Sequence, residues 1–273
     1  MCYYSGQRVT KAEFIQLKQL EKAVKDYDFL DVGVHNGFNY APCAIAVPTE
    51  DRRDFDIVQA EWGYVAGDVK TREEAKQFRL RYATLNFRGE NLFVREDGKK
   101  SMWAAAARNR RCLVLSTGII ESRHMEMYGK KGQLLKATEK IPYQVGVVGK
   151  EYFWFPGVYN YYFDSEKEQW IRTVAFATTA ANTTMQQIHN SQKRMPTMPP
   201  DDLCYEWLME NPTDERLLEI AVSQIPSNMM EACTIDKSYR NSGEAVPQEY
   251  DGHPALDLSF VDQEVLEFDH WRG

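Results

Sequence analysis

Cys2 is the residue of this chain with the clearest chemical potential, because it directly follows the initiator methionine. A small second residue normally permits removal of Met1, and Cys2 would then carry a free α-amine beside its thiol. The reference pKa values, about 7.7–8.0 for the amine and about 8.5 for the thiol, leave both groups a nucleophilic fraction near neutral pH. With an aldehyde, the amine forms a Schiff base and the thiol closes a five-membered thiazolidine ring. The N-terminus therefore predicts aldehyde capture.

Proton transfer must accompany that chemistry, and a carboxyl group and an imidazole are side-chain groups suited to it. Schiff-base formation needs a neutral amine and a protonated carbinolamine oxygen. A carboxylic acid whose pKa is raised by partial burial can do both jobs in turn, and a histidine exchanges protons readily near pH 7. Taken singly, Glu121 is equally well explained as a surface carboxylate, His189 as a helix-capping residue and Asn86 as a turn residue.

Composition and charge argue against a membrane-spanning protein, a secreted protein and a protein that coats nucleic acid broadly. The chain has 273 residues, of which 43% are hydrophobic and 27% charged, as in an ordinary globular protein. No apolar run reaches the ~18–20 residues of a membrane span, and no signal-peptide core follows Met1. We therefore expect a cytoplasmic protein without membrane contact. We also expect it to be a monomer. A net charge of −7 argues against a broad nucleic-acid coat but leaves room for a local basic groove.

The cysteines predict neither a disulfide framework nor a metal centre. They are five, dispersed, and without a C-x-x-C pair. Four of them lie in apolar surroundings and read as buried core thiols: Cys43, Cys112, Cys204 and Cys233. We expect no metal and no cofactor.

Hydrophobic periodicity and capping signals predict the elements that must position these side chains. Helices are expected over residues 11–26, 71–79, 101–110, 200–209 and 213–223. Strands are expected over residues 44–47, 56–64, 111–115, 143–148, 152–155 and 171–178. Strands outnumber helices and do not alternate with them regularly, which favours an α+β fold on a curved or barrel-like sheet. Beyond about residue 240 the chain turns polar, and we expect a C-terminal tail that adds a strand or stays partly disordered.

Several motifs occur in a fixed order along the chain. They are Cys2, Phe38-Asn39-Tyr40-Ala41-Pro42, Trp62-Gly63-Tyr64, Asn86-Phe87-Arg88-Gly89-Glu90, Ser116-Thr117-Gly118-Ile119-Ile120-Glu121, Ile188-His189-Asn190 and Arg194-Met195-Pro196. In this order they resemble the SOS response-associated peptidase (SRAP) family of abasic-site processing proteins. The resemblance covers residues 1–240 and implies a single domain with a mostly antiparallel, barrel-like sheet flanked by helices. Residues 241–273 would form a tail.

The resemblance also implies roles for named residues. Cys2 would link covalently to the ring-opened sugar of an abasic site in single-stranded DNA. Asn86 would hold the N-terminal amine or the adduct, Glu121 would move protons, and His189 would protonate the sugar oxygen or orient the adduct. The DNA contacts that it implies are Arg88, Arg194, Asn39, Pro42 and Trp62. The family is further credited with autoproteolytic loss of Met1.

The chain departs from the family pattern at three places that concern DNA. Tyr4 stands where the family often has arginine, so a phosphate contact is lost or replaced by stacking. Gly67-Asp68-Val69 lies where tryptophans often wedge against bases. Three extra residues, Ser191-Gln192-Lys193, separate His189-Asn190 from Arg194.

Two other function classes fit the same residues. One is a cysteine peptidase acting in trans, with Cys2 as nucleophile, His189 as base and Asn86 or Glu121 as orienting group. The other is a binding protein that keeps the fold without activity. Turnover of an unrelated peptide, or the absence of any covalent species with abasic DNA, would separate them from an abasic-site sensor.

Overall fold

The elements are described from a computed structural model in which residues 4–6 and 33–258 are placed. The predicted helix over residues 11–26, and Cys2 itself, lie outside the described residues. The described strands are β1 (Tyr4–Gly6), β2 (His35–Asn36), β3 (Pro42–Pro48), β4 (Phe55–Trp62), β5 (Asn86–Arg88), β6 (Arg111–Ser116), β7 (Gly118–Tyr128), β8 (Leu134–Val147), β9 (Phe153–Asp164), β10 (Gln169–Ala180), β11 (Arg194–Pro196) and β12 (Met230–Thr234).

The described α-helices are α2 (Arg72–Arg81), α3 (Ala104–Asn109), α4 (Thr183–Ile188), α5 (Asp201–Met209), α6 (Asp214–Ala221) and α7 (Tyr239–Ser242). The capping signal at α2 is confirmed, because the Thr71 side chain accepts a hydrogen bond from the Glu74 amide. Single-turn 3-10 segments lie at Gly37–Asn39, Gly89–Asn91 and Ser227–Met229.

Five strands close into a barrel in the order β10-β4-β3-β6-β9, with β9 pairing back onto β10. All of these pairs are antiparallel except β4 with β10. The expected α+β class with a curved, mostly antiparallel sheet is therefore confirmed, and the molecule forms one domain. Closure also removes the unpaired edges that an open sheet of these strands would expose.

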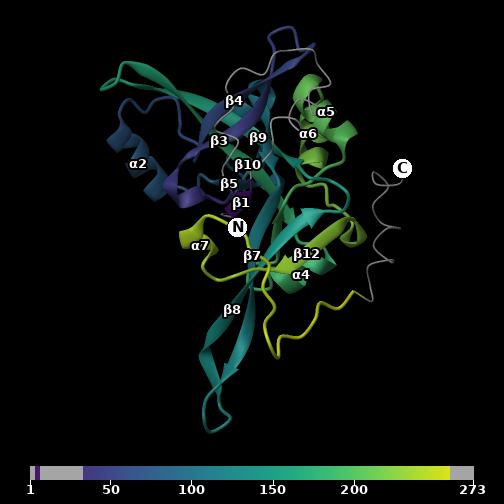
Figure 1. Ribbon diagram of the computed structural model, residues 1–273. Coiled ribbons are helices and arrows are strands. Elements are labelled where there is room, and N and C mark those ends of the chain that lie inside the picture. Colours follow the sequence, from purple (N-terminus) through teal and green to yellow (C-terminus); the bar gives the residue numbers. More distant parts are fainter. Residues whose placement is uncertain (1–3, 7–32, 259–273) are drawn as a thin grey trace.

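Alternating side chains of the barrel strands supply two separate core clusters. In β3, Ala44 and Ala46 join the cluster beneath α5 and α6, whereas Cys43 and Ile45 join the cluster that includes Phe155. Helices α5 and α6 lie together on one side of the barrel (Figure 1). Burial on both faces explains why these strands read as nearly continuous apolar runs.

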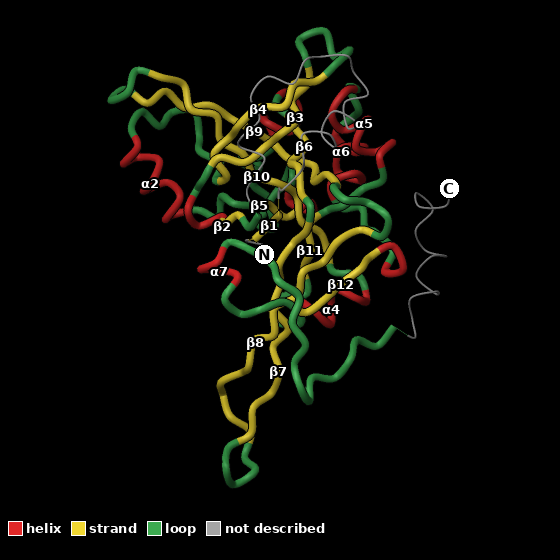
Figure 2. The backbone as a smooth tube through the Cα atoms, in the orientation of Figure 1, coloured by secondary structure: helices red, strands yellow, loops and turns green. Residues whose placement is uncertain are grey.

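A second sheet, in the order β12-β8-β7-β1-β2, lies below the barrel. Its strands β7 and β8 form a long hairpin that extends away from the body of the molecule (Figure 2). The predicted strand over residues 143–148 is only the buried end of β8, because residues 134–140 are exposed and lack an apolar pattern.

One prediction about the cysteines is wrong. Cys43, Cys112 and Cys204 are buried as expected, but Cys233 is exposed. Its strand β12 lies at the edge of the second sheet, and the alternation along β12 turns Met230 and Ala232 inward and Cys233 outward.

The C-terminal segment continues along the second sheet as far as it is described. Pro247 forms a bridge with Ile235, and the Tyr250 hydroxyl donates a hydrogen bond to the Ile235 carbonyl. Tyr250 and Leu256 pack against the cluster that contains Phe155. In the described part of the chain, no helix is long and apolar enough to cross a membrane.

Candidate functional site

His189 caps the C-terminal end of helix α4, and its ring is held by a hydrogen bond to a backbone carbonyl. Asn182 caps the start of this helix by accepting from the Met185 amide. At the other end, His189 Nδ1 lies 2.7 Å from the carbonyl oxygen of Arg194. A carbonyl only accepts, so Nδ1 carries the hydrogen and Nε2 is left to face the next group.

That next group is Glu121. Its Oε2 lies 3.6 Å from His189 Nε2. Both residues are buried, with 8% of Glu121 and 5% of His189 exposed to solvent. Strand β7 is buried from Gly118 to Glu121 and becomes more exposed beyond that point. Glu121 is thus the last fully buried residue before the hairpin leaves the core.

Burial lowers the pKa of His189 from 6.5 to about 4. The imidazole is therefore neutral at pH 7, and its Nε2 lone pair faces the carboxyl group of Glu121. The spacing of 3.6 Å is slightly longer than a direct hydrogen bond, so a small shift of either side chain allows a proton to pass between them. The pair is suited to general acid–base work.

A cavity of about 430 Å³ opens over this pair. Strands β1, β7 and β8, helix α7 and the loop after His189 contribute to it. Its lining residues are Tyr4, Ile120, Glu121, Ser122, His124, Lys140, His189, Ser191, Gln192, Tyr239 and Arg240. Lys140 and Arg240 add two cations to a site whose central groups are a carboxyl and a neutral imidazole.

Arg240 was not among the residues that the sequence singled out. Its guanidinium lies 5.3 Å from the centre of the Tyr4 ring and 5.5 Å from that of Tyr239, and it donates to the Tyr239 hydroxyl. The only sequence signal was Tyr4 itself, at the position where arginine was expected. Tertiary structure supplies a guanidinium at this place from the far end of the family domain.

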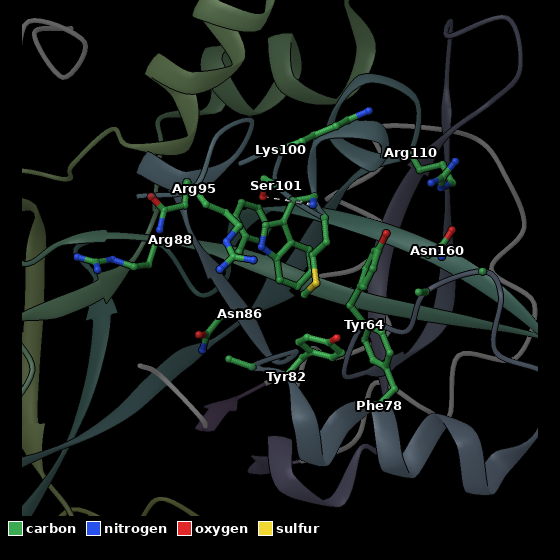
Figure 3. A pocket seen from close by; sticks show the side chains of 17 residues that line it. Tyr64, Phe78, Tyr82, Asn86, Arg88, Arg95, Lys100, Ser101, Arg110 and Asn160 are labelled. Atoms are coloured by element: carbon green, nitrogen blue, oxygen red, sulfur yellow. Dashed lines mark hydrogen bonds between the residues drawn. The ribbon is translucent and has the colours of Figure 1, made fainter. Parts of the chain in front are cut away.

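Asn86 and Arg88 belong to β5, which pairs in parallel with β10 at Phe176 and Thr178. They line a second, larger cavity of about 890 Å³, shown in Figure 3. Neither residue lines the cavity over Glu121 and His189. Strand β10 pairs with β5, which carries Asn86 and Arg88, and with β11, which begins at Arg194 beside His189.

The Asn86–Glu90 motif carries a glycine at position 89 because no side chain fits there. A Cβ atom at this position would lie 2.2 Å from the carbonyl oxygen of Ala221, at the end of α6. The close approach fixes the 3-10 turn that follows Arg88 against helix α6.

Comparisons with known proteins identify the family. The family described as "SOS response associated peptidase (SRAP)" matches residues 1–242. The chain belongs to the SRAP family. Membership associates this SRAP protein with the SOS response and with DNA damage. No curated protein matches the chain.

Solved structures share the fold of this SRAP chain at low sequence identity. A protein from Bacteroides thetaiotaomicron is 20% identical, with a TM-score of 0.70, over 88% of this chain and 94% of its own. A protein from Bordetella bronchiseptica is 14% identical, with a TM-score of 0.62, over 86% of this chain and 100% of its own. A phage-related protein from the same organism is 15% identical, with a TM-score of 0.56, over 90% and 100%.

Arg194 of the SRAP chain is buried and paired. Its guanidinium binds both carboxylate oxygens of Glu90, at 2.5 and 2.9 Å, and donates to the Thr178 carbonyl. The three extra residues before it form a turn in which the Lys193 amide donates to the His189 carbonyl and Lys193 has a φ of +51°. This turn returns the chain to His189, so the insertion leaves Arg194 beside it.

The remaining predicted DNA contacts differ in their exposure to solvent. Asn39 and Pro42 are exposed, at the end of a 3-10 turn and at the start of β3. Trp62 is 3% exposed, packs against Phe176 and donates its indole N–H to the Leu85 carbonyl. In this position it supports the strand that leads into Asn86 and presents no surface to a strand of DNA.

The arginines around the end of helix α3 differ in exposure. Arg108 pairs with Asp214, and Arg111 is buried and donates to backbone carbonyls that include those of Trp207 and Glu210. Among the described residues, no group of three or more histidine, cysteine, aspartate or glutamate side chains is arranged to hold a metal ion.

Proposed function

We propose that this SRAP protein captures abasic sites in single-stranded DNA through Cys2, after removal of Met1. The observation that supports this most is the buried Glu121–His189 pair, 3.6 Å apart, beneath a cavity that also carries Lys140 and Arg240. Such a cavity combines proton-transfer groups with cations suited to phosphate. Aldehyde chemistry on a nucleic-acid backbone needs both.

The covalent step balances without a cofactor. The neutral amine of Cys2 adds to the C1 aldehyde of the ring-opened sugar and gives a carbinolamine. Glu121 in its acid form protonates the departing hydroxyl, and water leaves as the imine forms. The thiolate then adds to the imine carbon, and the nitrogen takes a proton, which closes the thiazolidine. One water is released overall.

Each described residue has a defined part in this scheme. His189, neutral and fixed through the Arg194 carbonyl, accepts a proton at its free Nε2 and then passes that proton to Glu121 or to the sugar oxygen. Arg240 and Lys140 neutralise phosphates that flank the lesion. Asn86 hydrogen-bonds the amine or the adduct from β5, and Arg88 contacts the backbone beside it.

The test uses full-length protein with Met1 removed and a single-stranded oligonucleotide with one abasic site. Intact mass spectrometry should show a species equal to the protein plus the strand less one water, and no adduct with undamaged strand. Cys2→Ser should leave only an imine, which hydrolyses unless borohydride traps it. Persistence of the stable adduct in Cys2→Ser would overturn the proposal.

Glu121→Gln separates proton transfer from binding. We expect adduct formation to slow by about 10²-fold or more, as for loss of a general acid–base group, with unchanged affinity for undamaged strand. Glu126→Gln, on the exposed part of the same strand β7, is the matched control. Turnover of an unrelated peptide in place of adduct formation would favour a cysteine peptidase acting in trans.

A further inference from the structure

Residues 244–258 form an extended strap along the second sheet, the yellow segment that follows α7 in Figure 1. The region that matches the SRAP family ends at residue 242, so the strap lies outside it. The first half of the strap is fixed beside β12. There the Gln248 amide donates to the Thr234 carbonyl, and the Tyr250 hydroxyl donates to the Ile235 carbonyl.

The second half of the strap is hydrogen-bonded to both elements that carry the buried carboxyl–imidazole pair of the site. On the β7 side, Arg123 Nη1 donates to the Pro254 carbonyl over 2.8 Å. On the α4 side, the Gln187 side chain pairs with the backbone of Asp257. Its amide nitrogen donates to the Asp257 carbonyl, and its oxygen accepts from the Asp257 amide, both at 2.7 Å. Arg123 and Gln187 each lie two positions along the chain from a member of the pair.

A third link joins the end of α4 directly to β7. Asn190, which follows His189, accepts from the His124 amide and donates to the His124 carbonyl, both at 2.9 Å. This side-chain amide pairs with β7 as the backbone of a neighbouring strand would. Helix, strand and strap are therefore joined in a closed triangle, in which none can move relative to the other two without loss of a hydrogen bond.

The strap also reaches the side chain beside Glu121. Tyr143 of β8 lies directly opposite Glu121 in the strand register, so the two side chains leave the sheet on the same face as neighbours. Tyr143 is buried, and its hydroxyl is hydrogen-bonded to Nε2 of His253 in the strap. Leu256 of the strap packs against the apolar cluster that includes Ile188 of α4. The strap thus makes contact on the strand side and on the helix side of the pair.

The carboxyl–imidazole pair is sensitive to small displacements of these elements. Its two facing atoms are 3.6 Å apart, just beyond a direct hydrogen bond. General acid–base groups must come within hydrogen-bond reach, and a misplacement of about 1 Å can slow a reaction by about 10²-fold. Helix α4 has only six residues, and a helix of this length takes its position from the contacts that it makes with the rest of the molecule.

We propose that the strap is a positioning element, which fixes α4 against β7 through Gln187 and Arg123 and so sets the spacing of Glu121 and His189. Gln187 and Arg123 act through the pair and are positioning residues. The effect on rate rests on the proposed capture of abasic sites. The effect on the geometry of the pair is measured without DNA.

The first test measures the rate of adduct formation at saturating abasic strand, in full-length protein with Met1 removed. Gln187→Ala removes both bonds to Asp257, and Arg123→Ala removes the bond to Pro254. Each variant should react about tenfold more slowly and bind undamaged strand as the parent protein does. Arg123→Lys keeps a donor and should recover most of the rate. A role in stability alone would leave the saturated rate of the folded protein unchanged.

Gln186→Ala and Glu249→Ala are the matched controls. Gln186 neighbours Gln187 in α4, but its side chain donates to the Ala181 carbonyl at the start of the same helix. Glu249 is an exposed residue of the strap and belongs to none of the three links. Both controls should react at the parent rate. A parent-like rate in Gln187→Ala and in Arg123→Ala would overturn the assignment.

The second test measures the geometry without DNA. Nitrogen-15 NMR reports protonation and hydrogen bonding at each imidazole nitrogen, and loss of a signal in His189→Asn assigns it to His189. At pH 7 the Nε2 signal should shift in Gln187→Ala and in Arg123→Ala but not in Gln186→Ala. If these shifts occur and even the parent protein forms no adduct, the capture proposal fails and the strap assignment stands. An unshifted signal in both strap variants would overturn the strap assignment even where adduct forms.

Discussion

At the scale of single residues, the protonation state and tautomer of a side chain are set by the groups around it. Among the histidines that the structure describes, His189 is the one that faces a buried carboxyl group across 3.6 Å. Its tautomer follows from one hydrogen bond to the Arg194 carbonyl. Its neutral state follows from burial, which sets its pKa at about 4.

The pKa of His189 predicts how stability depends on pH. Above pH 6.5 the histidine is neutral in both the folded and the unfolded chain. As pH falls from 6.5 towards 4, the unfolded chain binds a proton that the folded protein does not, so the free energy of unfolding falls. The shift corresponds to about 3 kcal/mol lost by pH 4. His189→Asn keeps a donor for the Arg194 carbonyl, and it should remove the part of the pH-dependent loss of unfolding free energy that comes from His189.

Urea unfolding of both proteins at pH 7 and pH 4 measures the difference. His35, whose pKa burial also lowers to about 4, remains in both proteins and cancels in the comparison. An equal loss of stability in the parent protein and in His189→Asn would contradict the prediction.

Gly89 offers a second test at the same scale. Gly89→Ala places a methyl group 2.2 Å from the Ala221 carbonyl, so the turn after Arg88 must move away from α6. We expect a loss of about 1–3 kcal/mol in unfolding free energy, as for overpacking. Gly89 does not have a positive φ, so its loss comes from the steric clash. Gly98→Ala is the opposite case, because it meets no atom within 4 Å and its φ of +76° makes only the backbone strained. A smaller loss at Gly89 than at Gly98 would contradict the steric explanation.

At the scale of elements, β10 organises the site. It pairs with β9 and β4 to close the barrel, and then with β5 and β11 towards its C-terminal end. The change of partners occurs near Phe176, where the register with β9 ends. Strand β5 carries Asn86 and Arg88 to the larger cavity, and β11 begins at Arg194, whose carbonyl holds His189.

Helix α2 carries Phe78 into the larger cavity and ends at Tyr82, so its stability bears on the shape of that cavity. Thr71→Ala removes the hydrogen bond to the Glu74 amide and should lower the free energy of unfolding by about 1 kcal/mol. Thr71→Ser retains an oxygen at that position and should cost far less. Urea denaturation of the two variants decides between this account and one in which tertiary packing alone holds the helix.

At the scale of the whole molecule, charge is separated in space. A chain of net charge −7 carries cations in both cavities, of which Lys140, Arg240, Arg88, Arg95 and Lys100 are placed to meet phosphates. Repulsion from the acidic surface then opposes binding elsewhere and leaves the strand one favourable path.

This separation predicts a marked salt dependence. If three to five phosphates are neutralised, log K for a single strand should fall against log salt with a slope of roughly −2 to −3.5. The double variant Arg240→Gln with Lys140→Gln should reduce that slope by about 1.4, whereas Lys130→Gln with Lys131→Gln, at the tip of the β7–β8 hairpin, should leave it unchanged. A slope near zero in the parent protein would exclude binding through these cavities.

Local patterns in the sequence foresaw much of the fold. The strand ending at Pro48, the helix capped by Thr71 and the buried strand after Arg111 follow from apolar runs and capping residues, which act over a few positions. Cys233 was wrongly placed in the core, because an edge strand exposes one face that composition does not reveal. Strand β7 was not predicted and β8 was predicted only at its buried end, because the outer halves of both strands are largely exposed and lack an apolar pattern.

The types and order of the reactive residues are properties of the sequence alone, and they were enough to indicate the family and the class of chemistry. The tertiary structure decided which of those residues meet. It set Glu121 against His189, buried Trp62 and Arg194, placed Asn86 on a separate cavity, and brought Arg240 over Tyr4. These outcomes depend on barrel closure and on contacts between distant segments, and local spacing along a chain carries no record of either.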